Sequence, residues 1–264
     1  MKTEIDSNNV QLNILRNVDK NQDLHHETDA VAIHIESLDE YPQNNNQSRP
    51  IIKTANPAAL GLAGFALTTF TLQMHSFNWS GVGPTIWIGF IFGGVIQIIS
   101  AVLEFKCGNA FGMSTFGTYG SFWIAFTLMS IGDHFNIYKT TFTDQATLML
   151  AFTIYTAIMF VASLGLNATI ILLMGSLLLG LTFLDFKLFL LGSITSPTVH
   201  DVTRIMVAGK GFQYAAGVAL TISALSAWYI VASTVYMDVF GWNVLPLGPA
   251  VPKSFFRRFR KRWQ

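Results

Sequence analysis

Charged residues are scarce in this sequence, and the scarcity excludes most soluble folds. Asp, Glu, Lys and Arg make up 12% of the 264 residues, whereas 51% are hydrophobic. Soluble domains contain roughly 25% charged residues, because their surfaces face water. The net charge of +1 gives no indication of a nucleic-acid partner. The composition is instead typical of a protein whose surface faces lipid.

Residues and motifs that carry out common chemistry are also missing. The single cysteine, Cys107, excludes an intramolecular disulfide framework and a cysteine-rich metal site. The six histidines are scattered, so we expect neither a metal nor a cofactor. The sequence contains no GxxxxGK(S/T), GxGxxG or HExxH motif and no plausible hydrolase triad. These absences argue against a primary pump, an intramembrane metalloprotease and, more generally, an enzyme.

The first 53 residues differ in composition from the rest of the chain. They lack the apolar core that a secretory signal peptide needs. They contain five basic and nine acidic side chains, net −4, together with many Asn and Gln residues. Low hydrophobicity with net charge predicts disorder. We therefore expect a disordered polar tail over 1–53, a membrane domain over 54–248 and a basic tail over 249–264.

Long uncharged stretches fill much of the remaining chain. No Asp, Glu, Lys or Arg occurs in 54–103 or in 145–184, and each stretch is long enough for two spans of about 20 apolar residues. Turn-forming residues divide these stretches at 75–84 and 165–168. An open sheet is excluded in lipid, because its edges would stay unpaired. With two further spans at about 113–138 and 211–236, the sequence predicts an all-α membrane protein with six transmembrane helices, the other four lying at about 57–77, 85–104, 147–164 and 169–191.

Basic residues predict the orientation of these helices. Six Lys and Arg residues lie between positions 253 and 262, and such clusters stay in the cytosol. An even number of spans then places the N-terminal tail in the cytosol as well. The predicted outer loops hold only Lys139, Arg204 and Lys210. The basic cluster is either a plain topology signal, which we prefer, or also a contact for anionic lipid.

The first predicted helix begins with a distinct start signal, Asn56-Pro57, within the motif NPAALGL at 56–62. Asn is a strong N-cap, and Pro suits the first helical position. One interpretation is that the motif only starts a helix. The other is that its free N–H groups and the helix dipole attract an anion.

Glycines gather in and after the second predicted helix. They occur at 89 and 93 and again at 108 and 112, and both pairs have the GxxxG spacing that permits close helix contact. Small residues interleaved with Phe and Tyr over 104–123 also suit the wall of a narrow pore. Close packing is the simpler interpretation.

Four ionisable residues lie near or within the predicted spans, namely His75, Glu104, Asp185 and Lys187. Charges inside a membrane are costly and tend to be functional. All four nevertheless lie near predicted span ends, where long side chains can reach water. Glu104 is therefore either a functional residue or one half of an interfacial pair with Lys106.

Three motifs follow one another along the membrane part. The first is NPAALGL at 56–62 with GFALTT at 64–69, the second is GNAFG at 108–112 with TYGSFW at 118–123, and the third is FGWNVLPLG at 240–248. Together they resemble the acetate uptake transporter family, which includes bacterial succinate–acetate permeases and fungal acetate or ammonia-export proteins. The family motif usually reads Asn-Pro-Ala-Pro, and Ala59 replaces its second Pro here. That replacement loosens the helix start slightly, because Pro fixes φ.

The resemblance implies a six-helix protomer with its own pore, assembled as a hexamer. It also implies a hydrophobic constriction that matches Phe65, Tyr119 and Leu177 residue by residue. The match to Leu177 rests on Gly175-Ser176-Leu177 within an otherwise variable helix. An alanine linked to substrate size corresponds to Ala227.

We therefore expect a proton-coupled transporter or channel for acetate and similar small monocarboxylates in the plasma membrane. A carboxylate cannot cross hydrocarbon cheaply, so hydroxyls, amides and helix N-termini have to replace its water shell. Two alternatives stay open, an ammonium or ammonia exporter and a membrane sensor of acetate with little flux. The candidates for polar contacts are Thr68, Thr69, Gln97 and Asn109. The full set of candidate site residues is Asn56, Pro57, Phe65, Thr68, Thr69, Gln97, Glu104, Asn109, Tyr119, Leu177 and Ala227.

Overall fold

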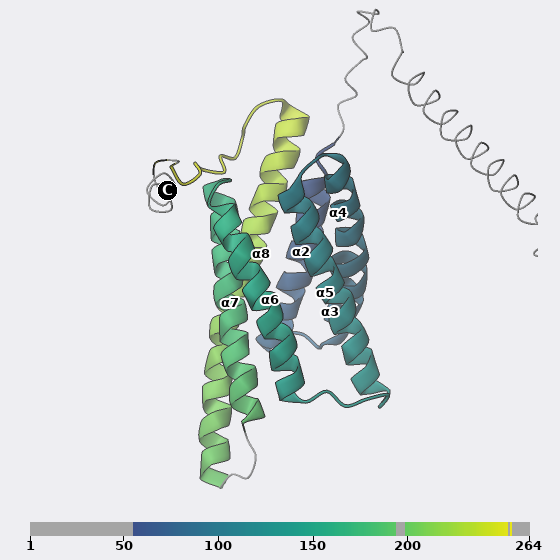
Figure 1. Cartoon of the computed structure of the whole chain (residues 1–264), viewed down its shortest axis with the longest axis vertical. Coiled ribbons are helices and arrows are strands. Elements are labelled where there is room, and N and C mark those ends of the chain that lie inside the picture. Colours follow the sequence, from purple (N-terminus) through teal and green to yellow (C-terminus); the bar gives the residue numbers. More distant parts are fainter. Residues whose placement is uncertain (1–54, 194–198, 253, 255–264) are drawn as a thin grey trace, which may run out of the picture. The chain divides into compact units, whose positions relative to one another are not determined.

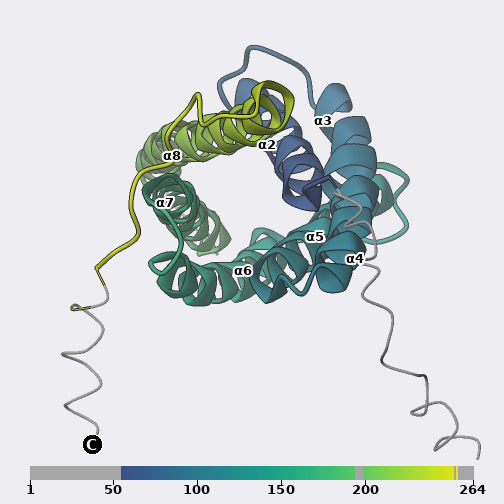
Figure 2. The same cartoon turned by 90° about the horizontal axis from the view of Figure 1, so that it is seen from above.

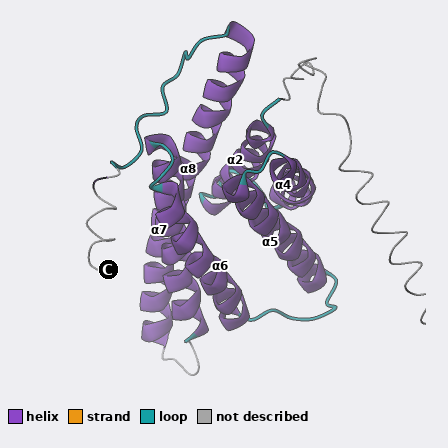
Figure 3. Cartoon of the chain, turned by 45° about the horizontal axis from the view of Figure 1, so that its top comes forward, coloured by secondary structure: helices purple, strands orange, loops and turns teal. Residues whose placement is uncertain are grey.

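The computed structural model describes residues 55–193, 199–252 and 254, and every regular element among them is helical (Figures 1 and 3). The prediction of an all-α protein is thereby confirmed. The described helices all belong to one compact unit, which begins at Ala55. The predicted polar tail over 1–53 and the basic cluster at 253–262 lie outside the described residues.

Six long helices correspond to the six predicted spans. Residues 83–106 run as one helix whose middle part, η1, is π-helical and contains three glycines. Five of the six are long and apolar enough to cross a membrane. The sixth, α5, is 25 residues long, but its Gly, Ser, Thr and Tyr residues lower its mean hydropathy. The elements are α2 (Pro57–Ser76), α3 (Gly83–Ile88), η1 (Gly89–Ile96), α4 (Gln97–Lys106), α5 (Ala110–His134), α6 (Phe142–Ser163), α7 (Ala168–Gly192) and α8 (Val199–Phe240).

The start of the last helix was predicted wrongly. We expected a loop up to residue 210, whereas α8 begins at Val199 and continues for 42 residues. At 1.5 Å per residue it is about 63 Å long, roughly twice the hydrocarbon thickness of a bilayer. Arg204 and Lys210 are therefore helical residues and not loop residues. Polar residues mark where a helix leaves hydrocarbon, but they do not end the helix.

The helices of this unit are arranged in a ring when viewed along their axes (Figure 2). Helix α7 packs along both α6 and α8, and α8 also packs along α2. On the other side, α2 and α5 pack against the continuous helix of 83–106. The N-termini of α2, α5 and α7 lie at one end of the ring, since consecutive helices alternate in direction.

Two of the glycines explain the close contacts on the 83–106 helix. An added Cβ at Gly93 would lie 2.7 Å from the Trp123 ring, and one at Gly89 would lie 3.2 Å from the same ring. The predicted helix contact of this glycine pair is therefore confirmed. The corresponding prediction for Gly108 is wrong, because Gly108 lies in the turn between α4 and α5 with φ +72° and not in a helix. Positive φ is available to glycine at little cost, which is why the tight turn uses it.

We expect Gly64→Ala to destabilise the folded protein strongly. The added Cβ would lie 2.5 Å from the carbonyl oxygen of Phe92, a backbone atom that no side-chain rotation can move. Overpacking of this kind destabilises by about 1–3 kcal/mol or more. Thermal unfolding of the detergent-solubilised protein measures the effect. The matched control is Gly211→Ala in α8, where no atom lies within 4 Å of the added Cβ. An equal loss of stability in both variants would contradict the proposed α2–η1 contact.

Candidate functional site

Three helices begin with an asparagine N-cap at the same end of the ring. The side-chain oxygen of Asn56 accepts a hydrogen bond from the Ala58 N–H at 3.0 Å, and that of Asn109 accepts one from Gly112 at 3.2 Å. Asn167 does the same for α7, with Ile170 as donor at 3.0 Å. Each cap stabilises its helix start, typically by about 1 kcal/mol. Each also fixes an amide group beside the positive end of a helix dipole.

All three asparagines line one cavity of about 260 Å³, which we call the asparagine cavity. First-turn N–H groups and asparagine amides are the donors that carboxylates and other anions bind at helix N-termini. Most of the remaining wall is apolar, so the polar groups are few and gathered at the helix starts. The other lining residues are Ala58, Leu62, Phe111, Gly112, Thr115, Phe116, Leu166, Ile170, Leu173, Met174, Ile230, Thr234 and Leu247.

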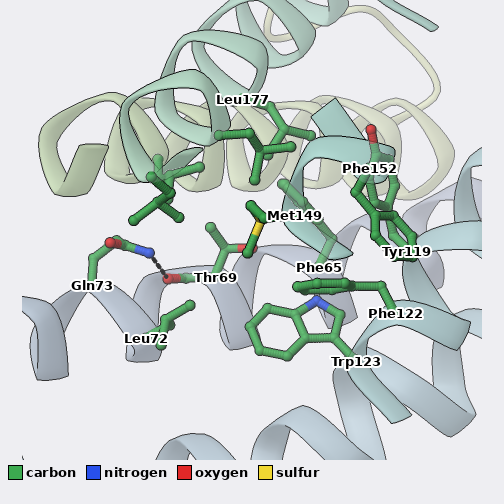
Figure 4. Close-up of a pocket in the computed structure, with 13 residues that line it drawn as sticks. Phe65, Thr69, Leu72, Gln73, Tyr119, Phe122, Trp123, Met149, Phe152 and Leu177 are labelled. Carbon is green, nitrogen blue, oxygen red and sulfur yellow. Dashed lines mark hydrogen bonds between the residues drawn. The ribbon is translucent and has the colours of Figure 1, made fainter. Parts of the chain in front are cut away.

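A second, smaller cavity follows further along the same helices. It measures about 50 Å³, which is room for one or two water molecules. We call it the apolar cavity, because its wall is almost entirely hydrophobic and aromatic (Figure 4). Its polar lining residues are Thr69 and Gln73, and the Gln73 amide donates to the Thr69 carbonyl at 3.3 Å. The remaining lining residues are Phe65, Leu72, Tyr119, Phe122, Trp123, Met149, Phe152, Leu177, Leu181, Leu184 and Leu220.

Phe65, Tyr119 and Leu177 line the apolar cavity at its end nearest the asparagine cavity, and we call them the boundary residues. On α2, α5 and α7, the residues before these three line the asparagine cavity, and the residues from these three onward line the apolar cavity. Phe65 lies nine residues after its N-cap asparagine, and Tyr119 and Leu177 lie ten after theirs. This spacing puts all three about 13.5–15 Å from the helix starts. They belong to one buried cluster, in which the rings of Phe65 and Tyr119 are 6.3 Å apart.

The hydroxyl of Tyr119 is hydrogen-bonded to another side chain. It lies 2.7 Å from the Thr156 hydroxyl, and Thr156 in turn donates to the Phe152 carbonyl. A hydroxyl has one proton to donate, so Tyr119 is the donor in the first of these bonds. The side chain is 5% exposed, and its ring also contacts Tyr155 edge-on. Tyr119 therefore has a fixed position at the boundary.

The C-terminal motif at 240–248 helps to close the asparagine cavity. The backbone N–H and the hydroxyl of Thr169 both donate to the Leu247 carbonyl, at 3.0 and 2.9 Å. Ser233 on α8 donates to the Leu245 carbonyl at 2.6 Å, and Tyr229 donates to Pro246 at 3.0 Å. These bonds fold the segment across the start of α7, and the Leu247 side chain lines the cavity there.

Several residues predicted from the sequence lie outside the described cavity walls. Thr68 is buried, donates to the Gly64 carbonyl at 2.8 Å and faces Gly93. Gln97 is also buried and packs against Gly64 and Gly120. Ala227 is fully buried in the cluster that contains the boundary residues, but it lines neither cavity. Pro57 occupies the first turn of α2, where it supports the helix start.

Glu104 does not form the interfacial pair with Lys106 that the sequence suggested. Its side chain is 1% exposed, and its Oε2 accepts a hydrogen bond from the Asn109 amide at 2.6 Å. Lys106 is exposed. The interfacial interpretation is therefore wrong, because the turn at 107–109 brings Asn109 back over the end of α4 and covers the carboxyl.

Sequence reasoning missed Asn167 as a site residue. The stretch 165–168 served only to divide two predicted spans, yet Asn167 caps α7 and lines the asparagine cavity. A comparison of helix starts would have found it, since Asn-Pro-Ala, Asn-Ala-Phe and Asn-Ala-Thr open α2, α5 and α7. Trp123 and Gln73 were also missed, since a buried aromatic or amide in a span carries no local signal of the cavity it faces.

Comparison with known proteins gives one family. A model described as the GPR1/FUN34/yaaH family matches residues 40–248. The succinate-acetate/proton symporter SatP of Escherichia coli is 45% identical over 80 residues, which are 30% of this chain and 42% of that protein. Acetate permease A of Emericella nidulans is 34% identical over 154 residues, 53% of this chain and 49% of that protein. Ammonia transport outward protein 2 of Saccharomyces cerevisiae is 41% identical over 80 residues, 29% and 28% of the two chains. These three alignments span less than half of each relative.

A solved structure matches over a longer range. The structure of the bacterial acetate channel SatP superposes with a TM-score of 0.65 at 27% sequence identity, and the match covers 74% of this chain and 100% of that one. The ring of helices is therefore shared with that channel.

Proposed function

The chain belongs to the GPR1/FUN34/yaaH family, and we propose on this basis that it carries acetate and similar small monocarboxylates across the plasma membrane, coupled to protons. It is a multi-pass membrane protein whose relatives include an acetate permease and a succinate-acetate/proton symporter. The observation that carries the proposal is the convergence of three asparagine-capped helix N-termini on one cavity.

The geometry suggests how a carboxylate is handled. In the asparagine cavity, amides and first-turn N–H groups take over the hydrogen bonds that water makes to the carboxylate. At the boundary residues the substrate meets an apolar wall of Phe, Tyr and Leu, which admits a small molecule and excludes a hydrated ion. Beyond it, Thr69 and Gln73 offer the polar contacts of the apolar cavity. The role of these side chains in transport is part of the proposal.

The same geometry favours a carboxylate over ammonium. Three helix N-termini place partial positive charge around the asparagine cavity, which attracts an anion and repels a cation. Export of ammonia is the second candidate, because one relative is named an ammonia transport outward protein. A sensor of acetate with little flux is the third. We expect no enzymatic activity in any of the three cases.

Uptake of labelled acetate into cells that lack their own acetate carriers tests the proposal. Expression of the chain should produce saturable uptake that grows as the external pH falls, relative to cells with an empty vector. Ammonium efflux from the same cells is measured in parallel. Efflux without acetate uptake would support the second candidate, and acetate binding without either flux would support the sensor.

We also propose that both termini face the cytosol and that six copies assemble. The N-terminus of α2 and the C-terminus of α8 lie at the same end of the ring. The Lys and Arg residues over 253–262 favour the cytosolic side for that end. Protease that reaches a terminal tag on intact cells would refute the orientation. The hexamer is supported by the family resemblance, and native mass spectrometry of the solubilised protein tests it.

A further inference from the structure

Glu104 is a buried carboxyl that is linked to the asparagine cavity through one side chain. Its Oε2 accepts a hydrogen bond from the Asn109 Nδ2 at 2.6 Å, while its Oε1 has no partner among the described residues. Asn109 meanwhile uses its own oxygen to cap α5 and lines the asparagine cavity. Asn109 is therefore both a partner of the buried carboxyl and a residue of the cavity wall.

No counter-ion accompanies this carboxyl in the described structure. Helix α4 packs against α2, η1 and α5. On those elements the titratable side chains lie toward the far ends of the helices or are engaged elsewhere. They are His75, which contacts the Ser80 carbonyl, Tyr119, which is bonded to Thr156, and Asp133 and His134 at the end of α5; on the α4 side, Lys106 and Cys107 are exposed.

The space around the carboxyl depends on a glycine. An added Cβ at Gly112 would lie 2.8 Å from Glu104 Oε2 and 2.8 Å from Asn109 Nδ2. The first turn of α5 is thus shaped around this pair of side chains. A residue other than glycine at 112 would push the carboxyl and the amide out of the arrangement.

We propose that Glu104 binds the transported proton and that Asn109 couples this proton to the carboxylate in the asparagine cavity, an inference that rests on the proposed function. When Glu104 is ionised, its negative charge lies one amide group away from the substrate carboxylate and repels it. A proton on Glu104 removes that charge. Since an amide has two N–H donors, Asn109 can then bind Glu104 and the substrate together. The proton leaves Glu104 when the carboxylate leaves the cavity, so one proton accompanies each anion.

Reconstituted vesicles separate coupling from substrate binding. Exchange of labelled for unlabelled acetate at equal pH needs the site but no net proton movement, whereas accumulation driven by a pH gradient needs both. Both are measured at alkaline pH, with the flux into protein-free vesicles subtracted. Glu104→Gln should keep exchange close to that of the unaltered protein and lose pH-driven accumulation by about 5–150-fold, the usual range of coupling between two sites.

Asp185→Asn is the matched control. Asp185 on α7 is a second buried carboxyl with an oxygen that lacks a partner among the described residues, but it lines neither cavity. This variant should retain both exchange and accumulation. The proposal is overturned if Glu104→Gln keeps accumulation, if it loses exchange and accumulation equally, or if Asp185→Asn alone loses accumulation.

If Glu104→Gln does not fold, a second variant tests the proposed coupling. Gly112→Ala retains the carboxyl but displaces it, so the ratio of accumulation to exchange should fall. An unchanged ratio in Gly112→Ala would overturn the proposal. If the unaltered protein shows no acetate exchange at all, the proposed function fails, which is a separate outcome from a failure of the coupling.

Discussion

Leu177→Ala should admit a larger monocarboxylate such as lactate while acetate still passes. Leu177 is 4% exposed, and it shares a buried cluster and the wall of the apolar cavity with Phe65 and Tyr119. Removing most of its side chain widens this boundary on the α7 side. We expect the lactate-to-acetate uptake ratio to rise by roughly tenfold, which corresponds to about 1.4 kcal/mol in relative barrier height. The ratio is measured as initial uptake of each labelled acid, normalised to protein at the cell surface.

Leu188→Ala controls for the loss of packing. Leu188 lies on the same helix and is buried to a similar extent, but it lines neither cavity. Both truncations should destabilise the protein, by about 2–5 kcal/mol each. Only Leu177→Ala should change selectivity. Ala227→Gly should leave selectivity nearly unchanged, because Ala227 is buried in the same cluster but lines neither cavity. If the ratio is the same in all three variants, the boundary residues do not form the constriction.

Asn167→Asp should abolish most acetate transport without loss of stability. Asp caps a helix as well as Asn does, and a negative charge at a helix N-terminus is favourable for the helix. The same charge repels a carboxylate in the asparagine cavity. Two like charges about 4 Å apart repel by roughly 1–4 kcal/mol between bulk water and an effective dielectric constant of 20, so uptake should fall by about tenfold or more. Asn56→Asp should act in the same way on α2.

The matched control is Asn136→Asp in the loop between α5 and α6. Asn136 is exposed at the opposite end of the ring and has φ 55°, a conformation that Asp also tolerates. The chemical change is identical, but no cavity-lining residue is altered. Acetate uptake should stay normal there, and thermal unfolding should be similar in all three variants. Normal uptake in both Asn167→Asp and Asn56→Asp would mean that these helix starts do not meet the substrate.

The sequence was informative where a feature is local. Asn56-Pro57 predicted the start of α2 to the residue, since capping and a fixed φ depend only on neighbours along the chain. The uncharged stretches at 54–103 and 145–184 predicted four of the six spans, because the thickness of the bilayer sets how many apolar residues a helix needs. The start of α8 was predicted wrongly, because a helix can continue beyond the hydrocarbon as long as its backbone hydrogen bonds continue.

The composition and the order of motifs determined the class of protein, the helical fold and the family resemblance, because they depend on hydrophobicity and on short patterns of residue types. Only the tertiary structure decided which residues share a cavity. Asn56, Asn109 and Asn167 are more than fifty residues apart from one another and meet because α2, α5 and α7 start at the same end of the ring. Gln97, a candidate of the same chemical type, faces Gly64 and Gly120 instead. The difference lies in the rotation of each helix about its axis, which is set by packing against neighbouring helices and not by the helix's own sequence.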